Sequence, residues 1–162
     1  MRNVHEIALQ DGGVALVDRA DADLVAGFSW RRIGNGYVQA SRGNLYLYLH
    51  RLVAGAGAGE SVDHANGDPL DNRAANLRIA TASENGANRG PDRRRAGRTS
   101  RFKGVSLDRS RGKWMAWIHV NGKTRSLGRF AEEEDAARAY NAAALEAWGE
   151  FARLNDVPDR ED

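Results

Sequence analysis

The segment from Gly86 to Ser100 constrains the fold of this chain more than any other segment, because it divides the 162 residues into two parts. It reads GANRGPDRRRAGRTS, with glycine, proline and five arginines and without apolar periodicity, which is typical of a flexible linker. Each flanking part must therefore form a small core of its own. We predict an N-terminal domain over residues 1–88, a basic linker over 89–100, a C-terminal domain over 101–156 and an acidic tail over 157–162.

Charge is unevenly distributed along the chain, although the total is only +2. Residues 86–130 carry 13 Lys and Arg against 2 Asp and Glu, a net charge of +11, whereas residues 1–85 carry −2 and residues 131–162 carry −7. So concentrated a positive charge repels itself unless a polyanion neutralises it, which points to nucleic acid. The basic linker then has two compatible interpretations. It is disordered alone, and it becomes an arm that follows phosphates or enters the minor groove of bound DNA.

Composition also excludes several classes of protein. The chain has no cysteine, which excludes disulfides and zinc sites built on cysteine. We find no apolar run long enough to cross a bilayer and no charged-then-apolar leader, so we expect no membrane partner. We expect a cytoplasmic protein, associated with the nucleoid of a bacterial or phage-infected cell.

The N-terminal part reads as short strands followed by a turn-rich unit. A strand is expected over Ala15–Asp18, and a short helix over Asp21–Phe28 with Asp21 or Asp23 as its cap. Asn35-Gly36 indicates a turn between residues 31–33 and 37–40. Leu45, Leu47 and Leu49 alternate with Tyr46, Tyr48 and His50, which predicts a strand over residues 45–50.

The stretch from Val62 to Asn85 carries the most chemistry. Its pattern predicts a strand that ends in Asp63 and His64, a loop that begins with the turn Asn66–Pro69, a second strand over residues 77–80, and a helix from Ala82. This ββα order places Asp63 and His64 opposite a helix that carries Asn85. Mg²⁺ prefers oxygen ligands and retains several waters, so one carboxylate and one amide oxygen suffice to hold it. An imidazole that titrates near neutral pH can deprotonate an attacking water, and these groups together suit phosphodiester hydrolysis.

The same residues resemble the HNH (His-Me finger) endonucleases, in particular the phage and intron-associated group with the string DHINGxxxDNRxxNLR. The matching segments are Asp63–Gly67, Asp71–Arg73 and Asn76–Arg78, and Leu49–Val53 matches the HRLV element of that group. The resemblance covers residues 1–88, with the ββα core over about 45–88. It implies that His64 is the general base, that Asp63 and Asn85 hold one divalent metal, Mg²⁺ or alternatively Mn²⁺, and that Asn76 braces the loop between the strands.

Other polar residues in this part have simpler interpretations. His50 is included with His64 and Asn76 among the catalytic candidates, and for it a structural or substrate-orienting role is favoured over metal binding. Turn and loop fixing is favoured for Asp68, Asp71, Asn72 and Arg73.

The C-terminal part has the pattern of three strands and a helix. Strands are expected over residues 102–107, 113–120 and 123–130, with Asn121-Gly122 as the turn of a hairpin. A helix is expected over residues 132–148, with a packed stripe of Ala136, Tyr140, Ala143, Ala144 and Ala147. In the second strand Trp114, Ala116, Ile118 and Val120 face one way, and Met115, Trp117 and His119 face the other.

This part resembles the AP2/ERF DNA-binding domain, through Phe102–Val105, Gly112–Trp114, Leu127–Phe130, Glu134–Tyr140 and Phe151–Asn155. The resemblance implies a three-stranded sheet in the major groove, backed by the helix. Ser106, Asp108 and Ser126 replace two arginines and a tryptophan of the plant pattern, so the target sequence stays open. Arg125 has the parity of Leu127 and can reach out from the packed side. The candidate DNA-binding residues are Arg94, Arg101, Lys103, Arg109, Arg111, Lys113, Trp117, His119, Lys123 and Arg125.

The sequence thus predicts an α+β chain: an N-terminal ββα-metal nuclease domain with a small β-rich part before it, a basic linker, and a three-stranded antiparallel sheet packed on one helix. We expect a site-directed endonuclease of homing, mobile-element or phage type that cuts double-stranded DNA as a monomer or a transient dimer. The alternatives are a DNA-binding regulator with an inactive nuclease fold and a structural nucleoid or packaging protein, neither of which needs Asp63, His64 and Asn85.

Overall fold

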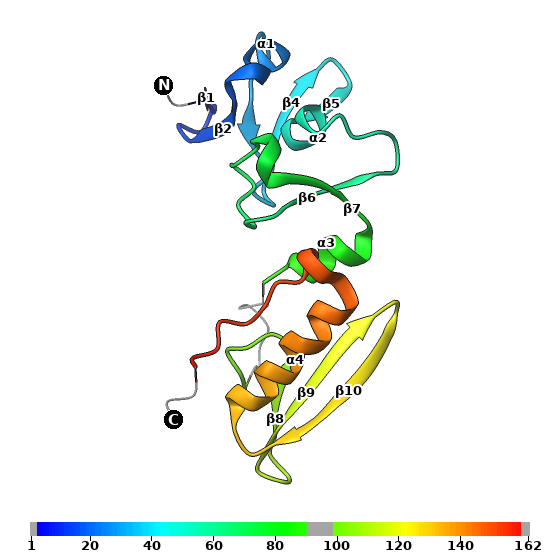
Figure 1. The fold of residues 1–162 in the computed structure, drawn as a ribbon. Coiled ribbons are helices and arrows are strands. Elements are labelled where there is room, and N and C mark those ends of the chain that lie inside the picture. Colours follow the sequence, from blue (N-terminus) through cyan, green and yellow to red (C-terminus); the bar gives the residue numbers. More distant parts are fainter. Residues whose placement is uncertain (1–2, 91–98, 160–162) are drawn as a thin grey trace. The chain divides into compact units, whose positions relative to one another are not determined.

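The computed structural model describes residues 3–90 and 99–159, and the chain divides into two compact units, Met1–Asn85 and Gly86–Asp162. Most of the predicted linker (residues 91–98) and the end of the predicted acidic tail (residues 160–162) lie outside the described residues. Both units combine short strands with helices, so the α+β prediction is confirmed (Figure 1).

The N-terminal unit is built from small antiparallel sheets. One sheet pairs β1 (Val4–Ala8) with β2 (Val14–Asp18), a second has the order β3 (Arg31–Arg32), β4 (Val38–Arg42) and β5 (Leu45–Tyr48), and a third pairs β6 (Ser61–His64) with β7 (Leu77–Ala80). The helical elements are η1 (Arg19–Asp21), α1 (Ala22–Val25), α2 (Leu49–Val53), η2 (Ala74–Asn76) and α3 (Ala82–Asn88). The turn predicted at Asn35-Gly36 is confirmed, since β3 pairs with β4 across it and Gly36 has a φ of +90°.

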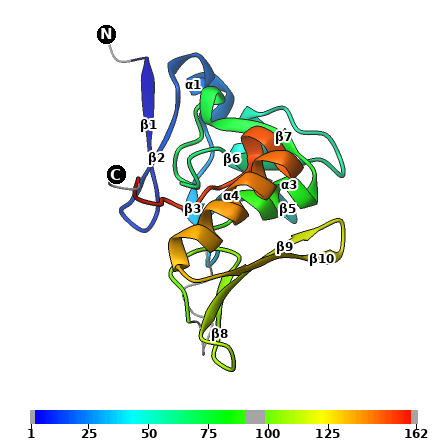
Figure 2. The same cartoon turned by 60° about the horizontal axis from the view of Figure 1, so that its bottom comes forward.

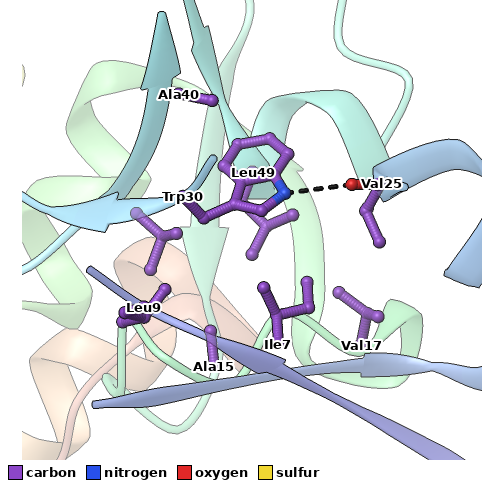
Figure 3. Close-up of a cluster of buried hydrophobic side chains, with 9 residues drawn as sticks. Ile7, Leu9, Ala15, Val17, Val25, Trp30, Ala40 and Leu49 are labelled. Carbon is purple, nitrogen blue, oxygen red and sulfur yellow. Dashed lines mark hydrogen bonds between the residues drawn. The ribbon is translucent and has the colours of Figure 1, made fainter. Parts of the chain in front are cut away.

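A buried apolar cluster holds the first two sheets of the N-terminal unit together. Trp30 lies within it, and its indole Nε1 donates a hydrogen bond of 3.1 Å to the Val25 carbonyl (Figure 3). Leu49 is fully buried in the same cluster. Burying a side chain of this size stabilises a fold by about 1.5–3 kcal/mol. The cluster contains Ile7, Leu9, Ala15, Val17, Val25, Trp30, Val38, Ala40 and Leu49.

Two predictions for this unit were wrong in extent. The helix expected over Asp21–Phe28 ends at Val25, because Ala26 is already extended with a ψ of 149° and Gly27 follows with a φ of +78°. Asp21 makes no capping bond through its side chain. The strand expected to reach His50 ends at Tyr48, and α2 begins at Leu49. Leu49 and His50 are both buried, and consecutive residues of a strand point to opposite faces. A helical turn buries both on the same side.

The C-terminal unit is a three-stranded sheet covered on one face by a helix. The sheet has the order β10 (Lys123–Phe130), β9 (Lys113–Val120), β8 (Val105–Asp108), and every pairing is antiparallel. Helix α4 (Glu133–Trp148) crosses one face of it, and η3 (Gly149–Phe151) follows (Figure 2). The hairpin at Asn121-Gly122 is confirmed, with φ values of +51° and +75° at the two turn residues, as a type I′ turn requires.

The core of this unit lies between α4 and the inner face of the sheet. Ala116 and Ile118 of β9 are buried against Tyr140 and the alanines of α4, which confirms the predicted inner face of β9. The stripe on α4 differs by one residue, because Ala137 is buried and Ala147 is exposed. The first strand begins at Val105 and not at Phe102, because Gly104 has a φ of +73°, outside the extended region.

Among residues 3–90 and 99–159, no helix is both long and apolar enough to cross a membrane.

Candidate functional site

The hairpin of β6 and β7 fixes the position of the predicted nuclease residues. Asp63 and His64 end β6, opposite Arg78 and Leu77 of β7, and α3 follows directly after β7. Asp63 and His64 are 4% and 5% exposed, so both side chains are desolvated at the end of a strand. The predicted ββα order is therefore present at this site.

The His64 imidazole lies among aromatic rings and one amide. Its Nε2 is 3.3 Å from the Oδ1 of Asn72, its ring stacks on Tyr37 at a centroid distance of 5.9 Å, and the His50 ring meets it edge-on at 5.3 Å. Burial lowers the pKa of His64 below its ordinary value, and the hydrogen bond to Asn72 and the nearby Asp63 carboxylate oppose this shift in part. The ring is therefore neutral at pH 7 and able to accept a proton.

His50 lies beside His64 on α2 and is also buried. Burial, then the charge of His64 and that of Arg51, lower the pKa of His50 to about 4. Its ring packs against Tyr37 at 4.7 Å and Tyr48 at 5.7 Å. Its Nδ1 is buried and has no hydrogen-bond partner among the described residues. Such an atom is uncommon in a folded protein and is available to a water, a metal or a substrate group.

Asp63 forms a buried ion pair with Arg78 across the hairpin. One carboxylate oxygen, Oδ2, accepts from the Nε of Arg78 at 2.9 Å and from its Nη2 at 2.7 Å. The guanidinium balances the charge of a carboxylate that would otherwise be costly to bury. The sequence did not single out Arg78 beyond its place in the matched segment Asn76–Arg78, and the structure sets it directly opposite Asp63 in the register.

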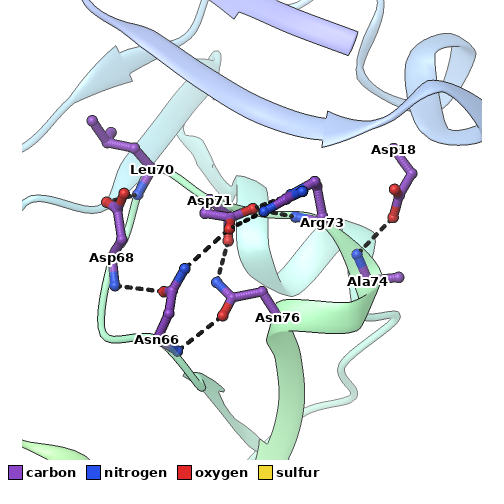
Figure 4. A network of polar contacts seen from close by, with 8 residues as sticks. All are labelled: Asp18, Asn66, Asp68, Leu70, Asp71, Arg73, Ala74 and Asn76. Atoms are coloured by element: carbon purple, nitrogen blue, oxygen red, sulfur yellow. Dashed lines mark hydrogen bonds and ion pairs between the residues drawn. The ribbon is translucent and has the colours of Figure 1, made fainter. Parts of the chain in front are cut away.

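A network of polar side chains holds the loop between β6 and β7. Asn76 accepts from the Asn66 backbone NH at 2.9 Å and donates to the Asp71 carbonyl at 2.7 Å, so it ties the two ends of the loop together (Figure 4). Asp71 pairs with Arg73 through both carboxylate oxygens at 2.7 Å, and Asp18 of β2 accepts from the Ala74 NH at 2.8 Å. The hydrogen bonds expected of a loop-bracing Asn76 are thus present. That this bracing contributes to catalysis remains a prediction.

The donor set at this site fits a hard divalent cation held by few protein ligands. In the described parts of the chain, no cluster of three or more His, Asp or Glu side chains is arranged to hold a metal. A metal here would depend on the carboxylate of Asp63, the amide oxygen of Asn85 on α3 and waters, which is sufficient for Mg²⁺. The buried Nδ1 of His50, which has no hydrogen-bond partner among the described residues, lies beside the His64 ring and is a further donor atom for a water or a ligand.

The sheet of the C-terminal unit has an outer face that α4 does not cover. Directly opposed residues of antiparallel strands share a face, so this face carries Met115, Trp117 and His119 of β9 together with their partners on both sides. Trp117 is half-buried and His119 is exposed, with its Nδ1 3.1 Å from the Thr124 hydroxyl. The partners of these three residues are Ser106, Thr124, Ser126 and Arg129, and the pair of Lys113 with Asp108 continues the same face.

Comparisons with known proteins match the two parts of the chain separately. Residues 47–87 match the family model described as HNH endonuclease, and residues 100–150 match the one described as AP2 domain. Together the two matches support an HNH-plus-AP2 architecture, and we call Met1–Asn85 the HNH unit and Gly86–Asp162 the AP2 unit.

Individual relatives agree with this architecture. The chain is 28% identical over 151 residues to an uncharacterized HNH endonuclease of Acanthamoeba polyphaga mimivirus, a match that covers 90% of the chain and 76% of the relative. The chain is also 43% identical over 63 residues to a putative AP2/ERF and B3 domain-containing protein of Oryza sativa subsp. japonica, a match that covers 39% of the chain and only 20% of that protein. No solved structure matches significantly. The HNH match and the viral relative support a nuclease, and both domain types imply DNA binding.

The candidate DNA-binding residues of the AP2 unit have different settings. Arg94 lies outside the described residues. Arg109 and Arg111 lie in the turn between β8 and β9, and Lys113 begins β9 opposite Asp108. Arg101 pairs with Glu134 at 3.2 Å and lies over the Phe102 ring. The register places Lys123 and Arg125 opposite Val120 and Ile118 on the helix side, and Arg125 approaches Glu146 of α4 at 3.5 Å. Arg125 therefore lies on the packed side of the sheet, as its parity with Leu127 predicted. Contact of these residues with DNA remains a prediction.

Arg129 was missed in the sequence, although it lies on the outer face of the sheet. Its Nε is 3.2 Å from the Oδ2 of Asp108, which also accepts from Arg111 at 3.3 Å. Hydrogen bonds from Ser110, then Arg129 and Arg111, lower the pKa of Asp108 to about 2. Asp108, which replaces an arginine of the plant pattern, thus forms ion pairs with Arg111 of the following turn and Arg129 of β10.

Lys103 provides a pH-dependent test of the packing in the AP2 unit. Its ammonium donates to the carbonyls of Ala87 and Arg89, and burial, followed by the charge of Arg153, lowers its pKa to about 8. Between pH 8 and the ordinary lysine value of 10.5 the unfolded chain holds this proton more tightly than the folded unit, so we expect the free energy of unfolding to rise with pH in this window. The difference in urea unfolding between wild type and Lys103→Met, measured across the window, isolates this contribution. A difference that does not change with pH would contradict the shifted pKa.

Proposed function

We propose that this chain is a DNA endonuclease of homing, mobile-element or phage type that hydrolyses phosphodiester bonds in double-stranded DNA. The AP2 unit would select the site and the HNH unit would cut the backbone. The observation that carries the proposal is the setting of His64, a buried and neutral imidazole that adjoins Asp63 at the end of β6. A single ββα site cuts one strand in each event, so we expect nicking, or double-strand cutting by two copies.

In this mechanism His64 removes a proton from the attacking water, because its lowered pKa keeps the ring unprotonated at neutral pH. Asp63 and Asn85 would hold Mg²⁺ or Mn²⁺. When bound, the metal supplies positive charge that stabilises the phosphate and the leaving oxygen. Arg78 holds the Asp63 carboxylate at the end of β6, and Asn76 holds the loop that follows His64.

Plasmid nicking in the presence and absence of a divalent metal tests the proposed function. Incubation of supercoiled plasmid with the full chain and Mg²⁺ or Mn²⁺ should give open-circular DNA. Excess EDTA should abolish the product, and renewed metal should restore it. A protein that shifts DNA in a gel but leaves the plasmid intact with either metal would instead support the alternative, a DNA-binding regulator with an inactive HNH fold.

The outer face of the AP2 sheet supports a DNA-binding role for Arg129. The Nε of Arg129 donates a hydrogen bond to Asp108, and this bond orients the arginine side chain in the absence of DNA. The guanidinium is half-exposed on the same face as Trp117 and His119. An arginine in this setting can donate from its Nη atoms to guanine or to a phosphate.

Arg129→Ala is expected to weaken DNA binding by about 1–3 kcal/mol if the side chain reads a base, or to lower the salt slope by about one charge if it contacts a phosphate. Fluorescence anisotropy on a DNA fragment over a series of salt concentrations measures both quantities. Arg138→Ala, on α4 and paired with Asp135 at 2.9 Å, is the matched control. Equal binding by Arg129→Ala, Arg138→Ala and wild type at every salt concentration would remove Arg129 from the interface.

A further inference from the structure

Asn72 is the most deeply buried polar side chain near the HNH site, with no exposed surface. Its backbone NH donates to the Leu16 carbonyl of β2 at 2.7 Å, and the Leu16 NH donates to the Leu70 carbonyl at 2.8 Å. The residue is thus fastened to a strand that belongs to a different sheet from His64. A fully buried amide held in this way has a fixed side-chain position, and the atoms that it faces decide what it does.

The two ends of the Asn72 amide have different partners, which determines its orientation. On one side the amide lies 3.2 Å from the Pro69 carbonyl, and a carbonyl oxygen can only accept a hydrogen bond. The NH₂ group must therefore point to Pro69, and the Oδ1 atom must point to the Nε2 of His64, 3.3 Å away. A flipped amide would set two oxygens against each other at Pro69.

The orientation of the amide determines the tautomer of the neutral His64 ring. An amide oxygen only accepts, so the hydrogen bond to Asn72 exists only when Nε2 carries the proton. In the neutral ring the lone pair is then on Nδ1, the other nitrogen. The stacked ring of Tyr37 and the edge-on ring of His50 oppose rotation of the imidazole, so neither nitrogen exchanges places with the other.

We propose that Asn72 is a positioning residue that holds His64 in the Nε2–H tautomer and makes Nδ1 the nitrogen that accepts the proton from water. This inference rests on the proposed function for its catalytic meaning, whereas the tautomer itself is a property of the protein alone. Loop fixing, which the sequence suggested for Asn72, accounts for its bond to Pro69 but not for the bond to the general base.

Nitrogen-15 NMR of the histidine side chains tests the proposal in the full chain at mildly alkaline pH. The chain has four histidines, and comparison with His64→Ala assigns the signals of His64. Long-range proton–nitrogen correlations distinguish the two neutral tautomers, and we expect wild-type His64 to be protonated at Nε2. Protonation at Nδ1, or an equal mixture of the two tautomers, would overturn the proposal without any variant.

Two substitutions separate positioning from a structural role. Asn72→Leu has a similar volume and no acceptor, so we expect a mixed tautomer and nicking slower by roughly 10- to 100-fold. Asn72→Asp keeps an oxygen that can accept from Nε2 but sets its second oxygen against the Pro69 carbonyl, so we expect the Nε2–H tautomer to return while the stability of the fold decreases. If Asn72→Leu is folded by its backbone NMR spectrum and retains both the tautomer and the rate, Asn72 has no positioning role.

The NMR and nicking results also distinguish this proposal from the proposed function. A wild-type protein with the Nε2–H tautomer that never nicks DNA would refute the nuclease and leave the Asn72–His64 pairing intact. Nicking by a wild-type protein with the Nδ1–H tautomer would support the nuclease and refute the proposed role of Asn72.

Discussion

Replacing His64 with alanine is expected to slow plasmid nicking by roughly 10²- to 10⁴-fold, the usual contribution of a positioned general base. The methyl group of alanine cannot accept a proton, and the neighbouring imidazole of His50 is a much weaker base, because burial lowers its pKa to about 4. DNA binding should be retained, because the outer face of the AP2 sheet belongs to the other unit. Single-turnover nicking with Mg²⁺, together with a gel-shift titration, measures the two properties separately.

The matched control is His5→Ala, the same substitution in the same unit. His5 lies on β1, which pairs only with β2 in its sheet, and we expect wild-type nicking from this variant. Nicking by His64→Ala at the wild-type rate would show that the observed cleavage does not use His64. In that case a contaminating nuclease would have to be excluded first, by showing that the activity elutes with the protein.

The sequence predicted the β6–β7–α3 core well because its signals are local. The turn residues Asn66–Pro69 and the alternation of Leu77 and Ile79 lie within the segment itself, and the strand expected over residues 77–80 matches β7 in full. The environment of His64 is not local. Tyr37 directly precedes β4 and His50 lies on α2, and both rings contact His64. Because both residues are distant in the sequence, no window around residue 64 contains the rings that desolvate His64.

The error at Leu49 has the same origin. Residues 45–50 alternate as a strand should, and nothing within them indicates where the strand ends. The end is set by the core, where Leu49 is fully buried and His50 must face His64. Tertiary packing overrides the period of two at this point.

Arg129 was missed for a different reason, a β-bulge. Strict alternation from Arg125 places Arg129 on the packed side of the sheet, with Leu127 between them. The pairing shifts between Ser126 and Gly128, where Gly128 has a φ of +126°, so Arg129 lies opposite Met115 on the outer face. One inserted residue reverses the face of everything after it, and neither composition nor periodicity reveals it.

Gly104→Ala is expected to have the largest effect on stability, because the new methyl group has no space. A Cβ at residue 104 would lie 2.1 Å from the Cδ2 of Tyr140 and 2.6 Å from the Trp117 carbonyl oxygen. Tyr140 is buried against the sheet, and the carbonyl belongs to β9, the central strand of the sheet. Neither atom can move without disturbing the core between α4 and the sheet.

Two costs add at this position. A left-handed conformation costs a residue with a Cβ about 1–2 kcal/mol, and the φ of Gly104 is +73°. Overpacking a filled core costs about 1–3 kcal/mol. We therefore expect Gly104→Ala to lower the free energy of unfolding of the AP2 unit by about 2–5 kcal/mol, a large part of the stability of a small domain.

Gly122→Ala separates the two costs. Gly122 has nearly the same φ, +75°, but a Cβ there meets no atom within 4 Å, so this variant carries the backbone strain alone. Urea unfolding followed by tryptophan fluorescence compares the variants, because Trp114, Trp117 and Trp148 all lie in the AP2 unit and Trp30 lies in the HNH unit. The AP2 signal should unfold at lower urea in Gly104→Ala than in Gly122→Ala. Equal midpoints would mean that Tyr140 yields to the methyl group, and that the close approach of Gly104 to β9 contributes nothing to stability.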